Sequence, residues 1–445
     1  MERVAIKISL GGGRRTLRRG DEGEDVRLLQ EKLASFGYDA GEIDGRFGYL
    51  TEDALIEFQR DHRLRVDAVA GPEVWAALEA GVPRRRVVHE VKPGERLADL
   101  ARRYDISVDG IRWMNRLRSR VRLLPGSRIV LRSSYVLAGL PAPAAATLQR
   151  APSAQRKCIS GLALYACKLL PDGTLEGGVD PALTAQARAN HWKLELALSA
   201  AGDGRGGDLI RTLASRGPRR RFLGSLGERL HEERWDALFL DIGPVPLGLG
   251  AGLLAGIASI KRSFPHMPLT VALAAPYDGW KGLVSDFDYP KLGKLVDRVA
   301  LALHRWDCLL LPGGKTPPRE EVERWVARTA RAVPPWKVLL GTPLGACRVG
   351  AHGPPVEVGY RAAVAAGLAA KRRPKPDEHG FLHLIVERGE ESGRYVLAGR
   401  ECLARWLALA HRYRLAGLFL HPVGLEDRRL WDVVYRRVWA EKSYV

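Results

Sequence analysis

The stretch Trp235–Pro246, with the sequence WDALFLDIGPVP, decides the fold of the largest part of the chain. Within it, Ala237–Leu240 is an uninterrupted apolar run, which is typical of a parallel strand covered on both faces. Asp241 follows where such a strand would meet its loop, the rim at which barrel enzymes hold their catalytic residues. Alternate side chains of a strand point the same way, and the residue two places after Asp241 is Gly243. Whether the protein is an enzyme depends largely on this glycine.

From about residue 133 onward, apolar runs of this kind alternate with segments of helical periodicity. The eight expected strands are Tyr135–Leu140, Ile159–Tyr165, Lys193–Ser199, Ala237–Gly243, Leu269–Ala275, Arg298–His304, Lys337–Pro343 and Leu415–His421. Helical segments lie between them, among others Pro181–Asn190, Glu320–Ala332 and Glu401–Tyr413. Eight alternating units predict an α/β fold, a single (β/α)8 barrel over residues 133–445.

A charged stretch, about Val356–Val396, separates the last two of these units. Within it, Phe381–Val386 and Tyr395–Leu397 have the composition of two strands that could form a hairpin. We therefore expect a small α+β insertion in the barrel at about residues 356–396.

The composition is that of a globular protein, with 46% apolar and 27% charged residues among 445. The formal net charge of +19 indicates a polyanionic neighbour, which could be nucleic acid, a wall polymer or anionic lipid. Basic runs occur at Arg84–Arg86, Arg219–Arg221 and Lys371–Arg373, but no stacking aromatic residues are interleaved with them. The sequence therefore disfavours nucleic acid as the partner.

Five cysteines occur without the CxxC spacing of a zinc site or the even number of a disulfide framework, so we expect buried thiols, no metal and no cofactor. Ile242–Ile260 carries no charge over 19 residues, but its two prolines and five glycines favour a buried or partner-covered loop and helix over a membrane span. The N-terminal sequence MERVAIKISLGGGRRTLRRG contains no apolar run long enough for a secretory signal peptide.

Residues 14–82 have the pattern of a small helical module. Apolar residues at Val26, Leu29 and Leu33 follow helical spacing, and a glycine-rich turn, Ile43–Gly48, precedes the next helix. The motifs LRRGDEGEDVRLLQEKLASFGY, IDGRFGYLTEDALIEFQ and VDAVAGPEVWAAL resemble the peptidoglycan-binding domain found on many wall hydrolases. The resemblance implies binding to wall glycan or its stem peptides. The residues expected at that contact are Asp44, Gly45, Arg46 and Phe47.

Residues 86–132 have a strand–helix–helix–strand pattern. The sequence HEVKPGERLADLARRYDISVDGIRWMN, followed by LLPGSRIVL, resembles the LysM domain, which binds N-acetylglucosamine-containing glycans between two loops. Carried over by this resemblance, the glycan-binding residues are Pro93, Gly94, Glu95, Arg96, Leu123, Leu124, Pro125 and Gly126. The family usually has an acidic residue and then a hydroxyl residue after the glycine, and here these positions hold Glu95 and Arg96.

Five motifs lie at the ends of the predicted barrel strands: PDGTL after the second, WDALFLDIGPVP at the fourth, DFDYPKLGKLVDRVALALH into the sixth, KVLLGTPLGA at the seventh and LAGLFLHPVGLEDRRLW at the eighth. Together they resemble the family-18 glycoside hydrolases, especially the spore cortex-lytic N-acetylglucosaminidases that carry LysM domains. The resemblance implies a location in the cell wall, spore coat or cortex of a spore-forming bacterium.

The catalytic signature of that family is an acidic ladder along the fourth strand, Asp-x-x-(Asp/Asn)-x-Asp-x-Glu. In this sequence its four positions hold Asp236, Phe239, Asp241 and Gly243, so the glutamate is absent. These enzymes use the acetamido oxygen of the substrate as nucleophile, and the glutamate protonates the leaving oxygen. General acid catalysis of this kind supplies about 10²- to 10⁴-fold in rate, and glycine has no proton to give.

Two further pocket positions differ from the family in the same direction. His304 stands where the sixth strand usually ends in a tyrosine, and His421 stands where a tryptophan floor is expected. We interpret both histidines as satisfied or solvated side chains rather than as acids. The expected remnant of the sugar pocket is therefore Asp241, His304 and His421, with Asp241 either binding sugar or holding a structural hydrogen bond.

These observations favour a non-catalytic protein that binds peptidoglycan or another N-acetylglucosamine-containing glycan of the wall or spore cortex. The alternative is an active N-acetyl-β-glucosaminidase that cleaves peptidoglycan or chitin-like glycan by the retaining substrate-assisted mechanism, with an acid recruited from elsewhere. The apolar helix at Leu247–Ile260 either docks a protein partner or another copy of the chain, or packs against neighbouring helices.

Overall fold

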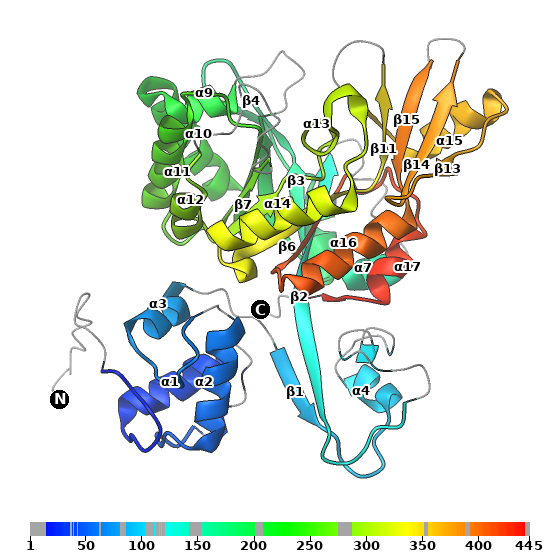
Figure 1. Cartoon of the computed structure of the whole chain (residues 1–445). Helices are drawn as coiled ribbons and strands as arrows, with labels where there is room; N and C mark the ends of the chain where they lie inside the picture. The colour runs from blue at the N-terminus through cyan, green and yellow to red at the C-terminus, as the bar shows by residue number, and fades with distance from the viewer. Residues whose placement is uncertain are drawn as a thin grey trace. The chain divides into compact units, whose positions relative to one another are not determined.

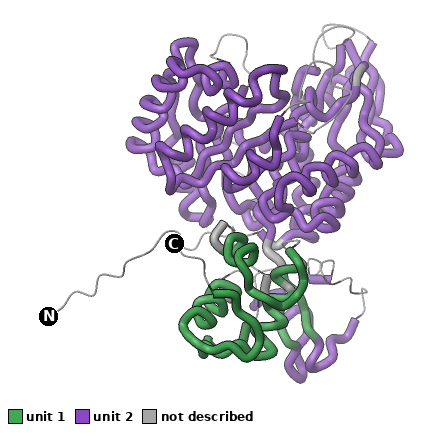
Figure 2. The backbone as a smooth tube through the Cα atoms, turned by 60° about the vertical axis from the view of Figure 1, so that its left-hand side comes forward, with its two compact units in different colours: residues 1–90, 128–132 green, residues 91–127, 133–445 purple. Residues whose placement is uncertain are grey.

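The computed structural model describes residues 15–35, 38, 40–41, 43–61, 64–80, 86–103, 108, 111–112, 115, 117, 121–141, 153–200, 208–274, 287–350, 355–387 and 392–440. The chain divides into two compact units (Figure 2). The first comprises residues 1–90 and 128–132, and the second comprises residues 91–127 and 133–445.

Three helices form most of the first unit, namely α1 (Glu24–Ser35), α2 (Tyr49–Asp61) and α3 (Pro72–Ala80). Their inward faces share one core, in which Leu29, Leu55 and Phe58 are fully buried, as the helical spacing of the apolar residues predicts. The segment before α1 joins this core through an antiparallel bridge between Leu17 and Ala70.

Two buried glutamines fix the turns that follow the first two helices. The amide of Gln30 donates to the Asp44 carboxylate (3.0 Å) and accepts from the backbone N–H of Gly45 (2.9 Å). The amide of Gln59 repeats the arrangement, donating to Asp67 (2.8 Å) and accepting from the N–H of Ala68 (3.0 Å). A primary amide can donate and accept at once, so each glutamine satisfies a turn that would otherwise bury unpaired backbone groups.

The predicted strand–helix order of residues 86–132 is present as β1 (Arg86–Glu90), α4 (Leu97–Arg103) and the start of β2 (Arg128–Pro141). Strand β1 pairs antiparallel with the first residues of β2, from Arg86↔Arg132 to Glu90↔Arg128. The sequence predicts that the closing strand of this region and the first barrel strand, Tyr135–Leu140, are separate. That prediction is wrong, because both belong to the single strand β2, which continues without a break into the barrel. No glycine or proline lies between Arg128 and Ala138, so nothing in this part of the sequence stops the strand. Much of the predicted second helix, including Ser107 and Met114, lies outside the described residues.

The barrel is a closed ring of eight parallel strands (Figure 1). In order around the ring they are β2, β3 (Gly161–Tyr165), β6 (Lys193–Ser199), β7 (Ala237–Gly243), β8 (Leu269–Leu273), β9 (Arg298–Leu301), β10 (Val338–Pro343) and β16 (Gly417–His421). Every predicted strand overlaps an observed one, and β6 and β7 match to the residue. Strand β9 ends at Leu301 rather than at His304, because the N–H of Leu303 turns back to the carbonyl of Leu301. The predicted end of the fifth strand, Ala275, lies outside the described residues.

Helices cover the outside of this ring (Figure 1). They are α7 (Ser153–Cys158), α8 (Pro181–Ala189), α9 (Leu209–Ala214), α10 (Arg216–Glu232), α11 (Gly250–Ser263), α12 (Tyr289–Leu295), α13 (Trp306–Leu309), α14 (Arg319–Ala332), α16 (Arg400–Arg412) and α17 (Leu430–Tyr435). Three short strands lie outside the ring: β4 (Cys167–Leu169) and β5 (Leu175–Gly177) pair with each other, and β17 (Trp439–Ala440) pairs with β2. The three helices named from the sequence are α8, α14 and α16, each within one residue of its expected ends at every terminus.

The predicted insertion lies between β10 and α16 and forms a five-stranded antiparallel sheet with one helix. Its elements are β11 (Ala346–Val349), β12 (Val356–Val358), α15 (Tyr360–Ala369), β13 (Lys375–Pro376), β14 (Phe381–Val386) and β15 (Gly393–Ala398). The expected hairpin is the pair β14–β15. The insertion starts earlier than the charge pattern predicts, because its first strand, β11, carries a single charge, Arg348, and begins with the buried residues Ala346 and Cys347.

The apolar helix α11 is covered on one side by the chain itself. It packs on α9 so closely that a Cβ at Gly256 would lie 2.4 Å from the carbonyl oxygen of Leu213. A Cβ at Gly252 would lie 2.9 Å from the Ala214 Cβ. Packing on α9 thus explains the absence of polar residues on this side of the helix, while Ala251 and Ala255 on α11 are exposed. Docking of a protein partner or another copy of the chain on that exposed side stays a prediction. No helix within the described ranges is both long and apolar enough to cross a bilayer.

Two glycine-to-alanine substitutions test this packing with opposite expected signs. Gly256→Ala should destabilise the barrel by about 1–3 kcal/mol, because the new methyl group overpacks the contact with α9. Gly224→Ala is the matched control in α10, where a Cβ has no neighbour within 4 Å, and it should stabilise by about 0.5–1 kcal/mol through helix propensity. Urea unfolding of the two variants measures both effects. Equal effects of the two substitutions would contradict the packing described here.

Candidate functional site

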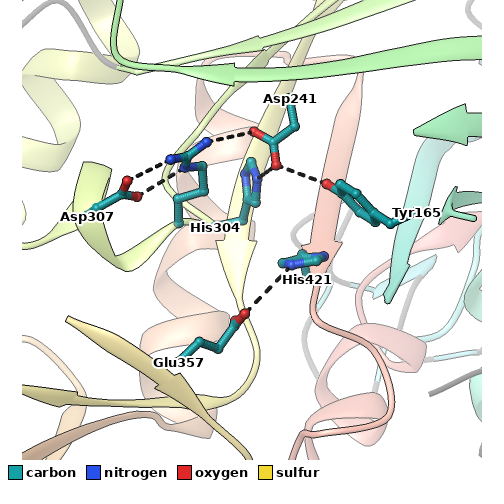
Figure 3. Close-up of polar contacts among 7 residues, drawn as sticks. Tyr165, Asp241, His304, Asp307, Glu357 and His421 are labelled. Carbon is teal, nitrogen blue, oxygen red and sulfur yellow. Dashed lines mark hydrogen bonds and ion pairs between the residues drawn. The ribbon is translucent and has the colours of Figure 1, made fainter. Parts of the chain in front are cut away.

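Asp241 lies at the end of β7 and is nearly inaccessible, with 5% of its side chain exposed. One carboxylate oxygen, Oδ2, accepts the hydroxyl of Tyr165 (2.9 Å) and the Nε2–H of His304 (3.2 Å). The other, Oδ1, faces the Arg305 guanidinium at 3.7 Å. Figure 3 shows Tyr165 and Asp307 on opposite sides of this carboxylate. Oδ2 thus has two hydrogen-bond donors from the chain, whereas the buried Oδ1 has the ion pair with Arg305 and no hydrogen bond among the described residues.

Arg305 is held between two carboxylates. Its Nε and Nη2 donate to the two oxygens of Asp307, at 3.0 and 2.6 Å, and its Nη1 faces Asp241. Only 12% of its side chain is exposed. Bidentate pairs of this kind fix the guanidinium in direction as well as in distance. The sequence analysis missed both residues, although the pattern His304-Arg305-Trp306-Asp307 directly after a predicted strand was a visible signal.

Gly243 is the place where the glutamate of the resembled family would stand. Its backbone has φ of 69°, in the left-handed region, and the ladder between β7 and β8 shifts register between Asp241 and Gly243. A Cβ built on Gly243 would lie 2.7 Å from both Cζ and Nη1 of Arg305. The space for a side chain at position 243 is therefore filled by a guanidinium.

The two predicted histidines lie together above an aromatic floor. The ring of His304 is fully buried and its centroid lies 5.5 Å from that of His421 and 4.5 Å from that of Phe419. Phe239, the second position of the ladder, packs under Phe419 at 4.4 Å and belongs to the barrel core. Nε2 of His304 is hydrogen-bonded to Asp241, whereas its buried Nδ1 has no hydrogen-bond partner among the described residues, so the interpretation of a satisfied histidine holds for one ring nitrogen only.

Glu357 reaches the same mouth from the insertion. It lies on β12, and its Oε2 is 4.0 Å from Nε2 of His421, the contact drawn at the bottom of Figure 3. Its side chain is 41% exposed. Burial, with the negative charges of Asp241 and Asp307, raises the pKa of Glu357 to about 7. The sequence could not single out this glutamate, because the topology of the insertion brings it to the barrel.

Burial alone would raise the pKa of the Asp241 carboxyl. The charge and hydrogen bond of His304, together with the charge of Arg305, outweigh burial and hold this pKa well below its usual range. Burial and the nearby Asp241 charge raise the pKa of Tyr165. Tyr165 therefore stays protonated, and its hydroxyl donates a hydrogen bond to the carboxylate. Burial, with the charge of His304, lowers the pKa of His421 to about 3. At neutral pH the centre of the mouth thus holds an ionised Asp241 and a neutral His421.

Asp236, the first position of the ladder, is not part of this site. It precedes β7, is exposed, and its carboxylate accepts the backbone N–H of Leu194 at 2.8 Å. The hydrogen bond ties the start of β7 to its neighbour β6, which is a structural role at the opposite end of the strand from Gly243.

The two LysM loops named from the sequence face one cavity of about 710 Å³. Six of the eight expected residues line it, namely Gly94, Glu95, Arg96, Leu123, Leu124 and Pro125. Of the other two expected residues, Gly126 lies in the turn that follows Pro125, where its N–H donates to the carbonyl of Val91 (2.8 Å). Pro93 is exposed and directly precedes Gly94 in the chain. The loops are therefore placed so that one ligand can touch both.

Only part of the turn expected to contact glycan in the helical module is accessible to a ligand. Asp44 and Arg46 are exposed, but Gly45 is buried and Phe47 is 2% exposed, within the module's core. Hydrogen bonds from Gln30 and from the N–H of Arg46 lower the pKa of Asp44. The expectation that the Phe47 ring meets glycan is therefore wrong, since that ring packs inward.

Family models match both small domains. Residues 22–78 match the model described as a putative peptidoglycan binding domain, and residues 89–132 match the LysM domain. Among curated proteins, the spore cortex-lytic enzyme of Bacillus cereus is 46% identical over 55 residues, which is 12% of this chain and 21% of the relative. The chain spans between 14% and 21% of the length of the curated relatives it matches.

The solved structures match the larger part of the chain. The spore cortex-lytic enzyme SleL of Bacillus cereus aligns with a TM-score of 0.57 at 16% identity, covering 97% of this chain and 99% of that one. A family-18 N-acetylglucosaminidase of Paenibacillus barengoltzii aligns with a TM-score of 0.51 at 15% identity, covering 68% and 99%. The barrel has the family-18 fold. At these identities the likeness establishes the fold and nothing more.

A pair of glycine variants isolates the crowding at position 243. Gly243 and Gly248 both have positive φ, but a Cβ at Gly248 has no neighbour within 4 Å. Gly248→Glu should therefore cost only the left-handed backbone strain, about 1–2 kcal/mol. Gly243→Glu carries the same strain and must also displace Arg305, so it should be destabilised by about 1–3 kcal/mol more. Equal unfolding midpoints for the two variants would show that Arg305 does not fill this space.

The pKa of His421 predicts a dependence of stability on pH. Its folded pKa of about 3 lies below the unfolded value of about 6.5, so below pH 6.5 the unfolded chain binds a proton that the folded chain does not. The contribution of the neutral His421 to the free energy of unfolding is therefore present in full above pH 6.5 and is lost as the pH falls towards 3. Relative to His421→Gln, the wild type should lose up to about 1.4 kcal/mol per pH unit across that window.

Urea titrations at half-unit pH steps measure this difference. The pKa of Glu357 is instead raised from 4.5 to about 7, so between these values the folded chain binds more protons than the unfolded chain. The free energy of unfolding that Glu357 contributes therefore falls as the pH rises through this window, and Glu357→Gln serves as the control of opposite sign. Asp241, His304 and Arg305 also face the imidazole and remain in every variant. A wild-type-minus-variant difference that does not change with pH would contradict the burial of a neutral His421.

Proposed function

We propose that the protein binds wall peptidoglycan through its helical module and its LysM domain, and that its barrel does not hydrolyse the glycan. The two family matches support the binding part of the proposal. Two weak sites on one chain act with a raised effective concentration along a polymer, so they hold it more firmly than either does alone. The net charge of +19 suits a matrix that carries carboxylates and phosphates.

The observation that carries the non-catalytic part is the position of Arg305 over Gly243. Substrate-assisted hydrolysis needs a group that gives a proton to the leaving oxygen. A guanidinium stays charged throughout the working pH range and gives up no proton, so it cannot replace a carboxylic acid. The family's position for the acid is therefore taken by a group that cannot do its chemistry.

The state of Asp241 supports the same conclusion. In the substrate-assisted scheme this aspartate orients the acetamide of the substrate. Here Tyr165 and His304 are both hydrogen-bonded to Oδ2, Arg305 forms an ion pair with Oδ1 at 3.7 Å, and solvent reaches almost none of the side chain. Of the two roles open from the sequence, we assign the structural hydrogen-bonding role to Asp241.

The cell wall or spore cortex is the location that these features support. The peptidoglycan-binding and LysM matches support this location, and the B. cereus relative is named as a spore cortex-lytic enzyme. We assign the protein to the wall or cortex of a spore-forming bacterium as a bound, non-lytic component.

One observation favours hydrolysis as a second candidate. Glu357 lies at the mouth with a pKa of about 7, so near neutral pH about half of its population is protonated. A carboxylic acid tuned in this way is suited to general acid catalysis. In this alternative Glu357 gives its proton to the leaving oxygen from the insertion, in place of the missing group at position 243.

One paired experiment separates the two candidates. Wild-type protein, Glu357→Gln and the control Glu387→Gln, an exposed glutamate of the same insertion, are incubated with insoluble peptidoglycan between pH 5 and 8. We expect all three to sediment with the wall and none to release reducing ends. The double variant Gly243→Glu with Arg305→Ala extends the test, because it removes the guanidinium that blocks the new glutamate.

Two outcomes would overturn the proposal. Reducing ends released by the wild type and by Glu387→Gln, but not by Glu357→Gln, would establish the hydrolytic candidate with Glu357 as its acid. Failure of the folded wild type to sediment with peptidoglycan would contradict both candidates, since both require wall binding.

A further inference from the structure

The cavity between the LysM loops has an apolar floor. Its apolar lining residues are Leu97, Val108, Val121, Leu123 and Leu124. Leu124 is 68% exposed, which leaves a large apolar side chain in contact with solvent at the rim. The volume of about 710 Å³ lies within the range of clefts that bury a small ligand. The faces of sugar rings pack well on such a floor.

The acid that lines this cavity is already used by the chain. Glu95 is 11% exposed; its Oε2 accepts the backbone N–H of Lys92 (2.9 Å), and its Oε1 pairs with Arg103 (2.8 Å). Its carboxylate therefore closes the first loop instead of facing the ligand. Among the lining residues that the structure describes, no other side chain is acidic.

Arginines stand on both walls of the cavity. Arg96 lies on the first loop with 78% of its side chain exposed, and its Nε is 3.4 Å from the Asp99 carboxylate. Arg122 lies on the second loop, is exposed, and has no carboxylate of the described residues within 4.0 Å. Arg112 lines the cavity between them. A ligand in the groove therefore passes between two exposed positive charges.

We infer that this groove selects glycans that carry an oxyanion beside the N-acetylhexosamine ring, over neutral N-acetylglucosamine oligomers. The inference rests on the proposed wall binding and names its ligand class. A neutral oligomer gains only apolar contacts and hydrogen bonds in the groove, whereas an acidic one also pairs with Arg96 and Arg122. The oxyanion is the free carboxylate of a muramyl residue or the phosphate of a wall polymer, and both have the same chemistry toward a guanidinium.

The test compares the affinity of the full-length protein for three soluble probes by isothermal titration calorimetry. The probes are the neutral N-acetylglucosamine hexamer, a peptide-free hexamer of alternating N-acetylglucosamine and N-acetylmuramic acid, and the same hexamer with its carboxylates converted to methyl amides. Exposed ion pairs each contribute roughly 1.5- to 5-fold in affinity, so the acidic hexamer should bind about 2- to 20-fold more tightly than the other two. The difference should shrink as salt is raised from 50 to 500 mM.

Matched variants assign the preference to the groove. Arg96→Gln with Arg122→Gln should bind all three probes with the affinity that the wild type shows for the neutral hexamer. Arg361→Gln, an exposed arginine on α15 outside the groove, is the control for a lost surface charge and should keep the preference. Competition by a soluble glycerol-phosphate polymer against the acidic hexamer shows whether phosphate enters the same site.

Each outcome is decisive. Equal affinity of the wild type for the acidic and neutral hexamers would overturn the inference while leaving wall binding in place. A preference that survives in the double arginine variant would also overturn it, because the selecting charge would then lie elsewhere in the chain. Failure to bind insoluble peptidoglycan is a separate result, which contradicts the proposed function itself.

Discussion

The Arg305 guanidinium lies over the backbone of Gly243 and is held there by Asp241 and Asp307. The three residues form one electrostatic unit, since removing either carboxylate would leave a largely buried charge with half of its partners. The same guanidinium therefore fills the space of the absent glutamate and forms the ion pair with Asp241. A glutamate at position 243 and this arginine cannot share the same space, and the account of the barrel follows from that exclusion.

The fold follows from the sequence to an unusual extent, because a parallel barrel repeats one pattern. Strand β7 was predicted to the residue from its apolar run and the carboxylate at its end. The errors are local. Strand β2 continues where two strands were expected, and the sixth strand ends early because its chain turns into α13. The apolar helix α11 could not be assigned a neighbour from its own sequence, because its contact with α9 depends on tertiary packing.

The site was only half predictable. Asp241, His304 and His421 could be found because strand ends converge at one rim of a barrel. Glu357 comes from an insertion whose position over the mouth depends on the topology of a second sheet, and no spacing in the sequence encodes that. The sequence does not distinguish Arg305 from the other arginines, because its position over Gly243 depends on the fold. The same limit applies to Phe47, which lies in a turn but points into a core.

A single-turnover measurement shows whether the barrel breaks glycosidic bonds. The protein is mixed in tenfold excess with a soluble hexamer of N-acetylglucosamine, and the products are followed by mass spectrometry over a day at pH 5, 6, 7 and 8. The account predicts that the hexamer remains intact at the rate seen in buffer alone, at every pH. Cleavage to shorter oligomers faster than in buffer at any of these pH values would contradict it.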